Sequence, residues 1–155
     1  ETGENIGLVS EAGAPAVADP GSEMVQLAYE KGIKVRPLVG PSSILLALMA
    51  SGMNGQSFCF HGYLPIDKKQ RAASIKNLER LSAVHDQTQA FIETPFRNNQ
   101  LLKDILENCR PETRLCVAAN LSLPNEFIRS ASIEKWKKNA PDLHKQPTVF
   151  LIYAR

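Results

Sequence analysis

The chain has 155 residues, of which 43% are hydrophobic, so it is long enough to bury a core in one domain or in two small ones. Its formal net charge of +2 at pH 7 is far below the basic excess of a dedicated nucleic-acid-binding domain, so charge neither demands nor excludes an RNA substrate. The longest apolar run, around residues 44–49, is too short to span a bilayer. We therefore expect a protein without a membrane segment.

The cysteines and histidines exclude two further classes. Three cysteines lie singly in apolar surroundings without C-x-x-C spacing, which argues against a disulfide framework and a zinc site and favours a reducing cytoplasm. The three histidines have no metal-ligand spacing either, so we expect no metal. The chain opens on Glu1 rather than methionine, shortly before an apolar stretch. We therefore expect a fragment of a longer protein that lacks an amino-terminal segment.

The first third of the chain predicts alternating strands and helices. Residues 6–10 have the pattern of a short buried strand, and Asp19 with Pro20 predicts the start of a helix that stops at Gly32. A second strand is predicted over residues 33–39. After it comes a helix that is apolar almost all round over residues 44–49, which predicts burial on all sides.

Turn residues cluster at residues 52–56 between two apolar stretches, which predicts a domain boundary. The boundary divides the chain into residues 1–54 and 55–155.

The second part continues the alternation. Strands are predicted over residues 57–60, 89–93, 114–119, 126–130 and 148–153. Helices are predicted over residues 68–81, from Phe96 onward, and after Ser132 with Trp136 in the core. Because strands and helices alternate, we predict an α/β fold with a sheet that is largely or partly parallel.

Two strand-to-helix turns are the strongest local signals. Residues 10–15 and 39–43 place small residues after a predicted strand, where open α/β sheets bind ligands and the backbone can approach a cofactor. Each turn alone is also explained as a tight connection, but two of them in register favour a binding site. Neither is a dinucleotide fingerprint or a phosphate loop.

A third candidate site follows the strand at 89–93. Glu93, Thr94 and Arg97 bring a carboxylate, a hydroxyl and a guanidinium together at a strand end. A helix cap with Thr94 at the N-cap and Pro95 at the first helical position explains the middle of this motif but not Glu93 or Arg97.

The basic cluster Lys68, Lys69 and Arg71 offers contacts to phosphates, although a solvated helix face explains the same pattern. Trp136 is expected in the core or at an interface rather than as a platform for a stacked base.

Five motifs in this order resemble one family. They are residues 8–15 with Asp19-Pro20-Gly21, then residues 40–43, 50–52, 60–65 and 93–97. Together they resemble the tetrapyrrole (corrin/porphyrin) methylase superfamily, in its branch of 16S rRNA cytidine 2′-O-methyltransferases. The resemblance covers nearly the whole chain.

The resemblance implies a fold and a cofactor. It implies two α/β domains with S-adenosylmethionine in the cleft between them, usually in a homodimer. Residues 1–54 would be the end of the first, Rossmann-like domain, and residues 55–155 the complete second domain with a mixed sheet flanked by helices.

The implied residues follow from the motifs. The cofactor would be bound by Ser10, Glu11, Ala12, Gly13, Ala14, Val17, Ser42 and Ser43 from the first domain, and by Ile92, Ala119, Asn120, Pro147 and Thr148 from the second. Lys68, Lys69, Arg71 and Arg97 are the candidate contacts to the substrate. Glu93 and Glu126 are the candidate general bases, because deprotonation of a ribose hydroxyl assists its methylation.

Two departures from the family pattern bear on activity. The family usually has Asp-Ala-Gly-Thr-Pro where this chain has residues 11–15, and Arg-Glu-Leu-Thr-Lys where it has residues 119–123. The sequence thus predicts a methyltransferase acting on an RNA ribose or on a tetrapyrrole-like small molecule. A paralogue that binds the cofactor without activity is the alternative from another class.

Overall fold

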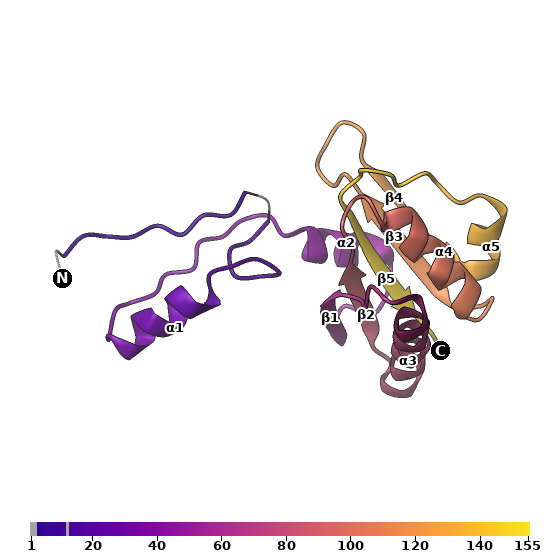
Figure 1. Ribbon diagram of the computed structural model, residues 1–155, viewed down its shortest axis with the longest axis horizontal. Coiled ribbons are helices and arrows are strands. Elements are labelled where there is room, and N and C mark those ends of the chain that lie inside the picture. The colour runs from indigo at the N-terminus through magenta and orange to yellow at the C-terminus, as the bar shows by residue number, and fades with distance from the viewer. Residues whose placement is uncertain (1–2, 12) are drawn as a thin grey trace. The chain divides into compact units, whose positions relative to one another are not determined.

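The computed structural model describes residues 3–11 and 13–155 in two compact units, Glu1–Ser42 and Ser43–Arg155 (Figure 1). Each unit is described by itself. None of the helices in the described residues is long and apolar enough to cross a membrane.

The first unit contains helix α1, Ser22–Glu30, which follows Gly21 at the N-cap with φ 138°. Glycine tolerates this non-helical conformation, so the helix starts only at Ser22, later than the predicted start at Asp19. Its end agrees with the prediction. Gly32 is left-handed with φ 67°, and the Ile33 amide donates to the Ala28 carbonyl at 2.8 Å.

The strands predicted over residues 6–10 and 33–39 are wrong for this structure, which assigns no strand to either segment. Ile6, Val9, Leu38 and Val39 are exposed. A strand is defined by a hydrogen-bonded neighbour, and neither segment pairs with one in the described part of the unit.

The second unit is a five-stranded mixed sheet with the order β1-β2-β5-β3-β4. Its strands are β1 Phe58–Tyr63, β2 Thr88–Ile92, β3 Arg114–Ala119, β4 Phe127–Ser132 and β5 Thr148–Tyr153. β1 and β2 are parallel, whereas β5 is antiparallel to both of its neighbours. The predicted mixed α/β sheet is confirmed.

Helices cover the two faces of this sheet unequally (Figure 1). One face packs against α3 Lys68–His85, α4 Asn98–Asn108 and α5 Ile133–Lys138, and the other packs against α2 Ser43–Ser51. Side chains alternate between the two cores along each strand, so Phe150 and Ile152 face the three helices while Val149 and Leu151 face α2.

Helix α2 differs from its prediction in burial. Ala47 and Leu48 are buried against the sheet, but Leu45 and Met49 are 50% and 79% exposed. The helix lies on a sheet face and buries only the side that touches it. Because α2 packs on β3, β4 and β5, the compact unit starts at Ser43, earlier than the domain boundary predicted after residue 54. That boundary stays a prediction about the domains of the family.

Candidate functional site: the carboxyl edge of the sheet

One edge of the sheet collects most of the predicted residues of the second unit. β1, β2 and β3 run in the same direction, and β5 runs against them, so the carboxyl ends of three strands meet the start of β5. Ile92 pairs with Val149, and Ala119 pairs with Thr148. We call this place the carboxyl edge. Open α/β sheets bind ligands at such edges.

Asn120 follows β3 in a left-handed conformation, with φ 52°. Its amide donates to the Pro147 carbonyl at 2.9 Å, and its Nδ2 donates to Gln146 Oε1 at 2.9 Å. Thr148 Oγ1 donates to the Gln146 carbonyl at 2.9 Å. Asparagine tolerates this conformation better than most residues. The predicted group Ala119, Asn120, Pro147 and Thr148 is therefore contiguous and held by Gln146.

Glu93 lies beside this group and is buried. Its Oε1 accepts from the Thr94 amide and from Arg97 Nη2, both at 2.6 Å. The ion pair with Arg97 is partly buried, because the Arg97 side chain is 37% exposed and the Glu93 side chain 1%. Glu93 therefore orients Arg97 in this state, and its role as a general base stays a prediction.

Two polar atoms at this edge are buried without a hydrogen-bond partner, Arg97 Nε and Asn98 Oδ1. Asn98 uses its Nδ2 to donate to the Gln146 carbonyl at 2.6 Å. Unpaired buried polar atoms are rare in folded proteins and each calls for an explanation. Here they offer one donor and one acceptor next to the predicted cofactor residues.

Glu126 is exposed in the loop after β3 and accepts from the Ser122 amide at 2.7 Å through Oε2. This contact closes the loop that leads from β3 to β4. The structure therefore assigns the Glu126 carboxylate a local role, and its role as a base stays a prediction.

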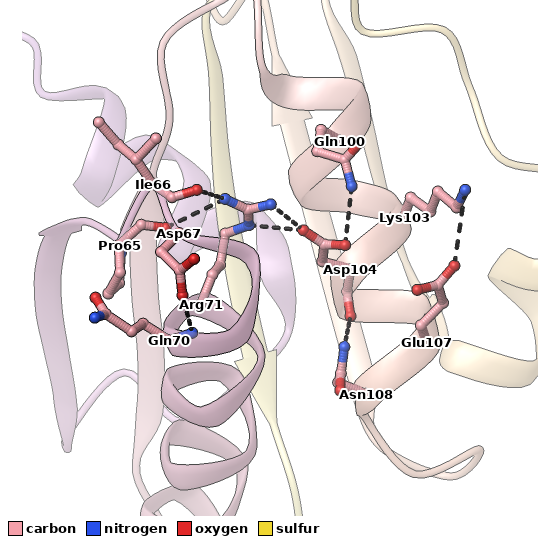
Figure 2. Close-up of polar contacts among 10 residues, drawn as sticks. All are labelled: Pro65, Ile66, Asp67, Gln70, Arg71, Gln100, Lys103, Asp104, Glu107 and Asn108. Atoms are coloured by element: carbon pink, nitrogen blue, oxygen red, sulfur yellow. Dashed lines mark hydrogen bonds and ion pairs between the residues drawn. The ribbon is translucent and has the colours of Figure 1, made fainter.

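The basic cluster is divided. Lys68 and Lys69 are exposed in the first turn of α3, which follows β1 at the same edge. Arg71 instead is buried, and Figure 2 shows it reaching from α3 to Asp104 on α4. Its guanidinium donates to Asp104 Oδ2 and to the Pro65 and Ile66 carbonyls. The predicted phosphate contact of Arg71 needs correction, because these partners occupy its buried guanidinium.

Most of the remaining predicted cofactor residues belong to the first unit. They are Ser10, Glu11, Gly13, Ala14, Val17 and Ser42, whereas Ser43 starts α2 in the second unit and Ala12 lies outside the described residues. The Val17 amide donates to the Ala14 carbonyl at 3.2 Å, and Gly13 has φ 80°, so residues 14–17 close a turn. A joint site with the carboxyl edge stays a prediction.

Sequence reasoning missed Asn98 and Gln146, which connect three segments of this edge. They lie far apart in the sequence, and neither residue belongs to a recognisable motif. Only the fold brings them together. The described residues also contain no group of three side chains suited to a metal ion.

Comparison with known proteins gives the family. Residues 1–136 match the description of the Tetrapyrrole (Corrin/Porphyrin) Methylases. The chain belongs to this family. The family prediction made from the five motifs is thereby confirmed.

The similar curated proteins are named ribosomal RNA small subunit methyltransferase I. The protein from Vibrio cholerae is 33% identical over 98% of this chain and 52% of its own length. The protein from Halalkalibacterium halodurans is 42% identical over 67% of this chain and 35% of its own length. This chain thus spans about half the length of the curated relatives it matches.

Solved structures support the fold. The methyltransferase CobJ has a TM-score of 0.58 at 22% identity, over 91% of this chain and 61% of its own. Uroporphyrin-III C-methyl transferase from Thermus thermophilus, complexed with S-adenyl homocysteine, has a TM-score of 0.53 at 18% identity, over 91% of this chain and 62% of its own. At these identities the likeness concerns the fold alone.

Proposed function

We propose that this chain is part of an S-adenosylmethionine-dependent methyltransferase that modifies ribosomal RNA in the cytoplasm as a homodimer. The observation that carries the proposal is the 33% identity to ribosomal RNA small subunit methyltransferase I over 98% of the chain. In this proposal residues 1–54 end the first methylase domain and residues 55–155 form the second.

The carboxyl edge suits the adenosine part of such a cofactor. Nucleoside pockets combine apolar walls with a few fixed polar groups. Ile92 supplies partly exposed apolar surface here, and the buried, unpaired Asn98 Oδ1 and Arg97 Nε are an acceptor and a donor at the same edge. We assign Ile92, Ala119, Asn120, Pro147 and Thr148 to the adenosine, and residues 10–14, Val17, Ser42 and Ser43 to the rest of the cofactor.

The bound cofactor would supply a methyl group on a sulfonium, and the protein's task is then to hold the acceptor oxygen in line and exclude water. Glu93 fixes Arg97 at the carboxyl edge, and Lys68 and Lys69 lie at the same edge in the first turn of α3. These cations suit an acceptor that carries phosphates.

Calorimetric titration tests the cofactor assignment. S-adenosylmethionine and S-adenosylhomocysteine would be titrated into this chain and into the complete natural protein that contains it. We expect micromolar binding by the complete protein and at least tenfold weaker binding after Gly13→Val or Thr148→Trp. Val84→Ala, on an exposed site near the end of α3, serves as the control. If the unaltered complete protein bound neither compound, the proposal of a methyltransferase would be refuted.

A transfer assay then identifies the acceptor. Methyl-labelled cofactor would be offered with small ribosomal subunits, with naked 16S RNA and with uroporphyrinogen. Transfer of label to RNA would support the proposal. Transfer to the tetrapyrrole alone would show that the acceptor is a tetrapyrrole and not RNA. Cofactor binding without transfer to any of them would indicate a paralogue without activity.

A further inference from the structure

Phe96 is a large aromatic side chain that the fold leaves in solvent. It follows Pro95 in the turn between β2 and α4, and it is 67% exposed. The lone tryptophan, Trp136, is in contrast fully buried and donates its Nε1 to the Leu115 carbonyl at 2.8 Å. Trp136 is therefore part of the core, whereas the ring of Phe96 is not.

The loop before β5 packs its polar side chains around this ring. The His144 ring meets the Phe96 ring edge-on with 6.1 Å between centroids, and Lys145 Nζ lies over the ring at 6.0 Å from its centroid. Lys145 is left-handed, with φ 60°, and its amide donates to the Pro95 carbonyl at 3.0 Å. A backbone conformation that side chains disfavour is thus maintained beside an exposed ring.

The same loop ties the ring to the carboxyl edge. Gln146, next to Lys145, accepts from Asn98 through its carbonyl and from Asn120 through its side chain. Pro147 and Thr148 come directly after it. The loop that contacts the Phe96 ring is therefore joined by hydrogen bonds to residues assigned to the adenosine.

The charges around the ring favour an anion. Lys145 is exposed and forms no ion pair with any of the described residues, whereas Arg97 is paired with Glu93. The neighbouring carboxylates already have partners. Glu93 accepts from Arg97, and Asp142 accepts from Asn99 Nδ2 at 2.7 Å and from the His144 amide at 2.9 Å.

We propose that Phe96 stacks on an unpaired base of the RNA substrate while Lys145 contacts a phosphate beside that base. This inference rests on the proposed function and gives a role to Phe96, which lies in the motif at residues 93–97 but was assigned no contact from the sequence. Proteins read unpaired RNA by stacking its bases on exposed aromatic rings and by placing Lys or Arg along the backbone. A ring beside the cofactor edge would hold a nucleotide near the reacting one.

The test measures RNA binding separately from cofactor binding and turnover. Fluorescence anisotropy of a labelled single-stranded RNA and of its duplex would be recorded with the complete protein and its variants. We expect Phe96→Ala to weaken single-strand binding roughly 5- to 150-fold, the range for loss of one base stack, and Phe96→Trp to restore it. Duplex binding should hardly change. Tyr29→Ala, at an aromatic residue of similar exposure, is the matched control.

The lysine has its own readout. Lys145→Gln should lower the slope of log affinity against log salt concentration by about 0.7, the value for one phosphate contact on a single strand. Lys76→Gln in the middle of α3 is the control and should leave the slope unchanged.

The outcomes separate the two proposals. Unchanged single-strand affinity in Phe96→Ala would overturn the stacking site and leave the methyltransferase intact. An equal loss on single strand and duplex would also overturn it, because a duplex base cannot stack on the ring. A protein that binds S-adenosylmethionine but no RNA would overturn the RNA acceptor as well. Cofactor titration of each variant checks that the edge is preserved.

Discussion

The guanidinium of Arg71 and the carboxylate of Asp104 form an ion pair between α3 and α4, with 2.5 Å between Nη2 and Oδ2. Their side chains are only 6% and 1% exposed. Gln100 donates to the second carboxylate oxygen at 2.9 Å, so the carboxylate is bonded on both oxygens (Figure 2). The pair fastens the start of α3 and the segment before it to α4.

Removal of the carboxylate should destabilise the protein strongly. Asp104→Ala leaves the Arg71 charge buried without its counter-ion, and we expect the free energy of unfolding to fall by about 3–5 kcal/mol. Urea denaturation followed by the fluorescence of Trp136 would measure the change.

Helix α4 provides the control for this experiment. Lys103 and Glu107 form an exposed pair with 3.9 Å between Nζ and Oε1. Glu107→Ala should cost at most about 0.5 kcal/mol, because water already screens such pairs. If the two variants lost equal stability, burial would not be the reason for the effect.

The cysteines should differ in reactivity. Burial raises the pKa of the Cys109 thiol from 9.0 to about 12 and that of the Cys116 thiol from 9.0 to about 11. Because the thiolate is the nucleophile, both should resist N-ethylmaleimide at pH 8 in the native protein. Cys59, which is half-buried, should react first. Mass spectrometry of the peptides before and after addition of urea would show the order.

The same pKa values give a pH dependence of stability. A raised pKa keeps the proton on the folded protein, while the unfolded chain loses it near pH 9. The unfolded state thus binds fewer protons above that pH, and the free energy of unfolding should fall as the pH rises from about 9 toward 11. Cys109→Ala and Cys116→Ala should each make this decline shallower. A decline of the same steepness in both variants would assign it to other groups.

Substitutions of Asn120 should separate the contributions of its backbone conformation and of its side chain to the free energy of unfolding. Asn120→Ala loses both the hydrogen bond to Gln146 and the better tolerance of φ 52°, so we expect a loss of about 1–3 kcal/mol. Asn120→Gly keeps the backbone and should lose about half of that. Ser122→Gly, at φ 66° in the same loop, should be neutral or stabilising. An Asn120→Gly variant less stable than Asn120→Ala would contradict this account.

The sequence predicted best those elements whose pattern reports their own burial. The bounds of β3 and β5 agree with the prediction because both strands are apolar runs buried between two layers. Residues 6–10 have a similar pattern but form no strand, since an apolar run does not reveal whether a neighbouring strand is present. Whether a segment forms a strand depends on a second segment that pairs with it.

The candidate site was predicted in the same uneven way. The motif at Glu93 and Arg97 was visible because its residues are close in sequence and pair directly. Arg71 was misjudged because its partner, Asp104, lies on another helix, and a basic cluster looks the same whether one member turns inward or not. Phe96 was given no role of its own, although it lies in the same motif as Glu93 and Arg97, because the pattern of a helix start does not reveal that its ring is exposed.

The place of β5 in the sheet has a consequence for synthesis on the ribosome. β5 comes after the other four strands of the described residues but pairs with β2 on one side and β3 on the other. Before residues 148–153 leave the ribosomal exit tunnel, the parallel pair β1 and β2 and the antiparallel pair β3 and β4 have no strand between them, and each pair has an open inner edge. Unpaired edges of this kind attract other strands. The emerging chain therefore needs protection until β5 closes the gap, and loss of β5 would divide the sheet into two separate pairs of strands.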